Sequence, residues 1–164
     1  MSAVDPIEEA GRQWSARGWD DATPGMLAVT SIMRAQAIVQ ARVDAVLRPL
    51  RLTFARYELL QLLSFTREGS LPMTRAGALL QVHPASVTNA AQRLEAAELV
   101  VRRPSPSDGR VVVVSITDEG RRVAAKATDA LNAEVFTRPG LAPDRVQDLV
   151  AVLRELRADA GDVE

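Results

Sequence analysis

The residues best suited to chemistry in this sequence are the polar side chains between positions 86 and 93. Val87, Ala91 and Leu94 recur at helical spacing after Pro84, so they define the inner face of a helix. The opposite face then carries hydroxyl, amide and guanidinium groups: Ser86, Thr88, Asn89, Gln92 and Arg93. Amides can pair with adenine through two hydrogen bonds, and hydroxyls can bind phosphates or base edges. This face is suited to the major groove of DNA, although an ordinary solvated helix face would have the same composition.

A β-hairpin is predicted directly after this helix. Two apolar runs, at 100–103 and 111–116, have the composition of strands, and the sequence Pro-Ser-Pro-Ser-Asp-Gly between them is typical of a hairpin loop. Arg102 and Arg103 alternate along the first strand, so only one of them can face DNA. Arg93, at the end of the preceding helix, has two interpretations: it contacts DNA, or it is a buried structural arginine.

The loop of this hairpin presents an arginine that suits a narrow minor groove, where the negative potential is enhanced. Arg110 stands at the end of the loop, and Asp108, two residues earlier, can hold its guanidinium in one orientation. The competing interpretation is that Arg110 only staples the loop through Asp108. The candidate DNA contacts in the hairpin are Arg103, Ser107, Asp108 and Arg110.

Groups for catalysis or metal binding are scarce. The chain has one histidine, His83, and no cysteine, which excludes disulfides, thiolate zinc sites and a His-rich metal site. It also lacks a glycine-rich phosphate loop and a nucleophile-elbow serine. We therefore expect neither an enzyme nor a metal or cofactor, and we interpret His83 as a helix cap rather than a pH switch.

The composition is that of one ordinary domain. The chain has 164 residues, of which 47% are hydrophobic and 25% charged, and its net charge is −1. Residues 71–115 carry a net charge of +2, a mild basic excess that is weak evidence by itself. No apolar run reaches the roughly 20 residues that a membrane helix needs, and the N-terminus does not resemble a signal peptide. We expect a cytoplasmic protein without a membrane partner.

Periodicity, caps and breakers predict the elements that position these residues. The long second helix ends at Pro49, Thr53 caps the third, and Thr117 caps the helix after the hairpin. A short helix and a tight turn precede the polar-faced helix, which is the order of a helix-turn-helix followed by a wing. The expected helices are at 6–17, 24–50, 53–67, 71–80, 84–96, 117–136 and 143–156.

Residues 82–120 resemble the winged helix-turn-helix of MarR-type transcriptional regulators. The similarity is carried by Arg93-Leu94-Glu95, Arg103-Pro104, Asp108-x-Arg110 and Ile116-Thr117-x-x-Gly120. It implies a mainly α fold with a small β-hairpin wing, in which N- and C-terminal helices form a homodimer. It also implies that the recognition helices enter successive major grooves and that Arg110 enters the minor groove.

Three departures from the family pattern affect the backbone. Gln81 and Glu98 stand where the family usually has glycine, and we expect a left-handed conformation at both positions, at a cost of about 1 kcal/mol each. Ala76-Gly77 replaces a leucine followed by alanine, which should weaken the packing of the short helix. None of these changes removes a DNA-contacting group.

The resemblance divides the chain into three regions. We expect residues 1–23 to be an extension, helical or partly disordered; 24–52 and 117–158 to be the dimerisation region; and 53–116 to be the DNA-binding lobe. Family members commonly bind a small anionic or aromatic effector between these last two regions. The candidate pocket residues are Trp19, Met33, Arg34, Arg56 and Tyr57, with Trp14, Ile38 and Arg42 nearby. The alternative is that these arginines extend into solvent or bridge the subunits.

The sequence therefore predicts a homodimeric regulator, a repressor, that binds a palindromic operator in double-stranded DNA and responds to a small molecule. The absence of cysteine excludes regulation by thiol oxidation. The alternative function is a winged-helix dimer that binds another protein without specific DNA binding.

Overall fold

The protein is represented by a computed structural model that describes residues 4–162. The described chain divides into two compact units, one ending at Val43 and the other beginning at Asp44. Residues 1–3 of the expected N-terminal extension lie outside the described residues. No helix in the described range is long and apolar enough to cross a membrane.

The first unit contains α1 (Pro6–Ser15) and most of α2 (Thr23–Leu47), which continues into the second unit. Asp5 caps α1, because its carboxylate accepts a hydrogen bond from the backbone N–H of Ile7 at 2.8 Å. Gly11 is buried, and a Cβ there would lie 3.0 Å from the side chain of Leu27 on α2. The expected N-terminal helix is therefore formed, and its small residue allows the two helices to pack closely.

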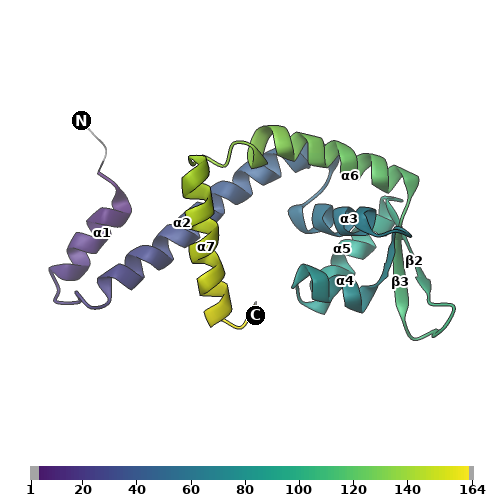
Figure 1. Ribbon diagram of the computed structural model, residues 1–164, viewed down its shortest axis with the longest axis horizontal. Helices are drawn as coiled ribbons and strands as arrows, with labels where there is room; N and C mark the ends of the chain where they lie inside the picture. The colour runs from purple at the N-terminus through teal and green to yellow at the C-terminus, as the bar shows by residue number, and fades with distance from the viewer. Residues whose placement is uncertain (1–3, 163–164) are drawn as a thin grey trace. The chain divides into compact units, whose positions relative to one another are not determined.

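The second unit contains the remaining elements, and Figure 1 shows α3, α4 and α5 beside a small sheet. A 3-10 turn, η1 (Arg48–Leu50), ends the long helix at the expected proline. The helices are α3 (Phe54–Phe65), α4 (Met73–Leu80), α5 (Pro84–Ala96), α6 (Asp118–Leu131), which continues as the π-helical η2 (Asn132–Phe136), and α7 (Pro143–Asp159). The strands are β1 (Ser70–Pro72), β2 (Val100–Pro104) and β3 (Val112–Ile116).

The sheet has three antiparallel strands in the order β1-β3-β2, and β1 was missed by the sequence analysis. We expected a helix from Leu71, but residues 70–72 extend along β3, with Leu71 opposite Val114. The pairing joins segments more than 40 residues apart, so local periodicity cannot reveal it. The helix therefore begins at Met73, and the sheet is larger than a two-stranded wing.

The core of the second unit lies where α3, α5 and the sheet meet. Its fully buried side chains come from elements distant in sequence: Leu47, Leu59, Leu60, Leu63, Leu94, Val100, Val114 and Leu131. Ala76 and Gly77 of α4 are also buried, and a Cβ added at Gly77 would lie 3.4 Å from Val87 of α5. Both small residues are therefore buried, and the weaker packing expected of this short helix stays a prediction.

Three non-glycine residues have a left-handed backbone within the described range. Gln81 (φ 52°) ends α4, and Glu98 (φ 59°) follows α5, as the sequence predicted. Arg51 (φ 56°) is a third that the sequence analysis missed. Each ends a helix, where a left-handed residue lets later N–H groups bind the last carbonyls.

The side chain of Gln81 joins the end of α4 to the end of α7. Its amide oxygen accepts a hydrogen bond from Arg157 at 2.9 Å, and its amide nitrogen donates to the backbone carbonyl of Asp162 at 2.5 Å. Arg157 also pairs with the Asp162 carboxylate at 2.5 Å. We call these three residues the Gln81 latch.

A second junction connects α5, the wing and α6 around the carbonyl oxygen of Leu99. This oxygen accepts a hydrogen bond from the backbone N–H of Thr117 at 3.0 Å and shares the Thr117 hydroxyl, at 3.1 Å, with the carbonyl oxygen of Glu98, at 2.9 Å. The same hydroxyl caps α6 by accepting from the N–H of Gly120 at 3.0 Å. A Cβ on Gly120 would overlap the Leu99 carbonyl and lie 2.8 Å from Ile116.

We expect Gly120→Ala to destabilise the fold by about 1–3 kcal/mol, because the added methyl group would push α6 away from the Leu99 carbonyl. Urea unfolding followed by circular dichroism measures this loss. Gly109→Ala is the control, since no atom lies within 4 Å of a Cβ built there. Equal midpoints for the two variants would contradict the close contact.

Candidate nucleic-acid interface

Helix α5 presents the polar face that the sequence predicted. Val87, Ala91 and Leu94 are at most 2% exposed, which fixes this side of the helix against the core. The side chains on the other face are exposed: Ser86, Thr88, Asn89, Gln92 and Arg93. Arg93 is therefore not a buried structural residue, and its exposure leaves it free to contact a ligand.

The start of α5 is set by local hydrogen bonds. Pro84 occupies the first turn, and Nδ1 of His83 accepts from the backbone N–H of Ala85 at 3.2 Å, which confirms the capping role expected for this histidine. The Thr88 hydroxyl donates to the carbonyl of Pro84 at 2.9 Å. Its proton is thus used within the helix, and in this rotamer Thr88 can only accept a hydrogen bond from DNA.

Arg102 and Arg103 have different environments, as their alternation predicted. The guanidinium of Arg102 pairs with Glu95 of α5 at 2.7 Å, and the backbone N–H of Arg102 donates to the same carboxylate at 3.0 Å. This pairing attaches the wing to the recognition helix. Arg103 is exposed, so it is the member of the pair that can face DNA.

The wing loop is ordered by its own polar groups. The Asp108 carboxylate accepts from the backbone N–H of Arg110 at 3.0 Å, and the hydroxyls of Ser105 and Ser107 lie 2.9 Å apart. Among the described residues no ion pair joins Asp108 to the guanidinium of Arg110, so the expectation that Asp108 orients this group is wrong. An Asx-type turn forms instead, because the carboxylate reaches the nearby N–H at smaller entropic cost. The Arg110 side chain is exposed at the loop end.

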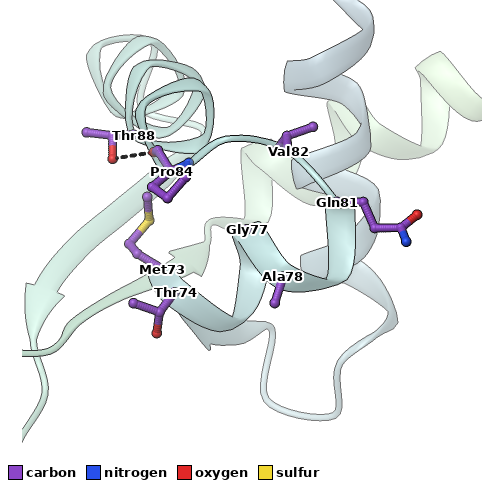
Figure 2. Close-up of a pocket in the computed structure, with 8 residues that line it drawn as sticks. All are labelled: Met73, Thr74, Gly77, Ala78, Gln81, Val82, Pro84 and Thr88. Atoms are coloured by element: carbon purple, nitrogen blue, oxygen red, sulfur yellow. Dashed lines mark hydrogen bonds between the residues drawn. The ribbon is translucent and has the colours of Figure 1, made fainter. Parts of the chain in front are cut away.

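Two grooves run along the two flanks of α5. The first has a volume of about 540 Å³ and lies between α4 and α5, and Figure 2 shows Thr74, Gly77 and Thr88 among its lining residues. The second has a volume of about 490 Å³ and lies between the start of α3 and α5. Its lining residues are Thr53, Ala55, Arg56, Ala85, Ser86, Asn89 and Ala90. The exposed face of the recognition helix therefore has a groove on either side.

The candidate effector-pocket residues fall in both units. Trp19, Met33 and Arg34 belong to the first unit, where Trp19 packs edge-on against Trp14 with ring centroids 5.0 Å apart. Tyr57, in the second unit, is buried, and its hydroxyl lies 3.2 Å from that of Thr128. Arg56 lines the groove beside α5. The structure thus places Arg56 with recognition-helix residues, which the sequence analysis did not foresee.

Comparisons with known proteins agree with this architecture. Residues 52–111 match the model of the MarR family. The crystal structure of Sco5413, a MarR family transcriptional regulator from Streptomyces coelicolor, is 47% identical in sequence, with a TM-score of 0.77. The match covers 86% of this chain and 98% of Sco5413. The chain belongs to the MarR family.

Other MarR-type relatives are more distant. The transcriptional repressor CouR, solved bound to a 23-mer DNA duplex, is 26% identical with a TM-score of 0.69, over 77% of this chain and 89% of CouR. CouR from Rhodococcus jostii RHA1 has also been solved with p-coumaroyl-CoA. The repressor Rv2887 of Mycobacterium tuberculosis is 29% identical over 85% of this chain and 97% of its own length. The chain spans about half the length, 53% and 41%, of two curated Bacillus subtilis regulators that it also matches.

The Glu95–Arg102 pair gives a testable pH dependence. Hydrogen bonds from the side chain and then the backbone of Arg102 hold the pKa of Glu95 below its usual value of 4.5. Because the pKa is lowered on folding, the pair stabilises the fold above about pH 4.5, and this contribution is lost as the pH falls through the lowered pKa. In an NMR titration we expect Arg102→Ala to raise the pKa of Glu95 toward 4.5.

Arg103→Ala is the matched control, since Arg103 is the neighbouring exposed arginine and should leave the titration of Glu95 unchanged. The same pKa for Glu95 in wild type and in Arg102→Ala would show that the pair does not form in solution.

Proposed function

We propose that this MarR-family protein is a homodimeric repressor that binds a palindromic operator in double-stranded DNA. The observation that supports this most directly is the face of α5, which exposes amides, hydroxyls and a guanidinium while its other face is buried. A helix of this kind can enter the major groove and read base edges. Two relatives favour the same function. CouR, solved bound to a DNA duplex, and Rv2887 are both named as repressors.

Apolar side chains exposed along two helices support the homodimer. On α2 they are Val29, Ile32, Met33, Ile38 and Val39, and on α7 they are Leu149, Val150, Val152 and Leu156. Exposed apolar surface on this scale favours burial against a partner. We assign residues 24–52 and 117–158 to dimerisation and 53–116 to DNA binding. A two-fold dimer would place two recognition helices on a palindromic site, one helical turn of DNA apart.

We assign separate roles to the exposed residues of the interface. Asn89 and Gln92 read bases in the major groove, while Ser86, Thr88 and Arg93 contact the backbone or base edges. On the wing, Arg110 enters the minor groove and Arg103 and Ser107 contact the backbone, with Asp108 shaping the loop. Because its ligand is chromosomal DNA, we place the protein in the cytoplasm. The proposed activity is binding, and no reaction is assigned to it.

We further propose that a small anionic or aromatic molecule controls DNA binding by favouring one arrangement of the dimer. The structure of CouR with p-coumaroyl-CoA is a precedent within the family. Trp19, Met33 and Arg34, which all lie in the first unit, remain candidates for its pocket.

Asn89→Ala tests base reading by α5. We expect the affinity for the DNA immediately upstream of the protein's own coding region to fall by roughly 1–3 kcal/mol per half-site, while affinity for random duplex stays the same. Fluorescence anisotropy with both duplexes gives the two affinities. Equal weakening on both would assign Asn89 to the backbone instead.

Arg110→Ala tests the minor-groove role of the wing. We expect weaker DNA binding and a salt dependence shallower by about one counterion per wing, because one phosphate-neutralising charge is lost. Sedimentation should still give a dimer, since the loop end contributes little to the core. Asp108→Ala is the matched comparison: it removes the hydrogen bond to the Arg110 backbone but keeps the guanidinium, so its loss should be smaller. Equal losses with an unchanged salt slope would leave Arg110 a purely structural role.

A further inference from the structure

The groove between α3 and α5 is lined by an arginine, Arg56, to which the proposed interface assigns no contact. Arg56 lines it together with Thr53 from the start of α3 and with Ser86 and Asn89 from the exposed face of α5. The groove has a volume of about 490 Å³, which is ample for a guanidinium and a phosphate oxygen to meet. We propose that Arg56 binds a backbone phosphate of the DNA that α5 reads, an inference that rests on the proposed function.

The position of Arg56 is fixed by its neighbours. One nitrogen of its guanidinium donates to the carbonyl of Arg51 at 3.0 Å. Arg51 has a left-handed backbone and closes a turn by donating its N–H to the carbonyl of Arg48 at 2.9 Å. A guanidinium has five N–H donors in a rigid fork, so this single bond orients the group toward Arg51 and leaves other donors for a ligand.

The surrounding charge favours an anion. Arg48, Arg51 and Arg56 occur within nine residues, and no acidic residue lies between 45 and 57. The one carboxylate on α3, Glu58, is not among the residues that line this groove. It lines an adjoining small cavity that shares Ala55, Ser86 and Ala90 with the groove. Burial raises the pKa of Glu58, as expected for a carboxyl that faces an apolar cavity. The groove itself therefore contains one cation and neutral polar groups.

The shape of DNA explains why both flanks of α5 matter. A helix lying in the major groove has a sugar-phosphate backbone on each side, and phosphate contacts fix its register and orientation. The flank toward α4 carries the hydroxyl of Thr74, which can donate to a phosphate oxygen. The flank toward α3 carries Thr53 and Arg56, whose fork matches phosphate geometry. With both flanks bound, α5 would be held at one angle in the groove.

The experiment uses the full-length protein with two duplexes, the DNA upstream of its own coding region and a scrambled sequence of the same length. We expect Arg56→Ala to weaken binding to both duplexes by a similar factor, roughly tenfold, because a phosphate contact does not depend on the base sequence. The slope of log affinity against log salt should become shallower by about one counterion per subunit. Arg56→Gln retains a donor for the Arg51 carbonyl without the charge, and it should show the same loss of salt slope.

Arg12→Ala is the matched control, because Arg12 is an exposed arginine on α1 that pairs with Glu9 and lies outside the ranges assigned to dimerisation and DNA binding. It should leave affinity and slope unchanged, and thermal melts should show that all variants are folded. If wild type binds neither duplex, the proposed function fails. If wild type binds and both Arg56 variants retain its affinity and slope, the phosphate contact alone is overturned. A loss confined to the upstream sequence would also overturn it, because it would make Arg56 a base-reading residue.

Discussion

The backbone carbonyl of Leu99 is the contact on which the geometry of the proposed interface depends. It receives two hydrogen bonds from Thr117, while the N–H of Leu99 donates to Leu94 at the end of α5. One residue therefore joins the recognition helix, the first strand of the wing and the start of α6. Gly120 makes this possible, because any side chain there would overlap the carbonyl. The ion pair of Arg102 and Glu95 adds a second connection from wing to helix.

The elements that the sequence predicted well are those determined by local chemistry. Thr53 and Thr117 cap their helices through side-chain oxygens, and Pro84 begins α5. The periodic Val87, Ala91 and Leu94 identified the buried face of α5 and hence its exposed face. The left-handed Gln81 and Glu98 were found because they stand where the family has glycine. In each case the decisive interaction spans only a few residues.

The features that the sequence could not provide depend on contacts across the chain. Strand β1 exists because β3 offers it a partner, and the local pattern of residues 70–72 does not distinguish it from the start of a helix. Asp108 had two donors within reach, the guanidinium and the backbone N–H of Arg110, and spacing alone did not favour either. Arg56 was assigned to an effector pocket from its place in the chain. That assignment stays a prediction, and the packing of α3 against α5 shows in addition that Arg56 lies beside the recognition helix.

The Gln81 latch connects the C-terminal end of α7 to the helix-turn-helix. A helix of 17 residues is a rod about 25 Å long, so a tilt of about 5° at one end moves the other by about 2 Å. Through Arg157 and Asp162 the moving end is attached to the turn that separates α4 from α5. All three bonds are exposed to water and so cost little to break. A tilt of the C-terminal helix would therefore reach the helix-turn-helix first at Gln81, the residue that ends α4.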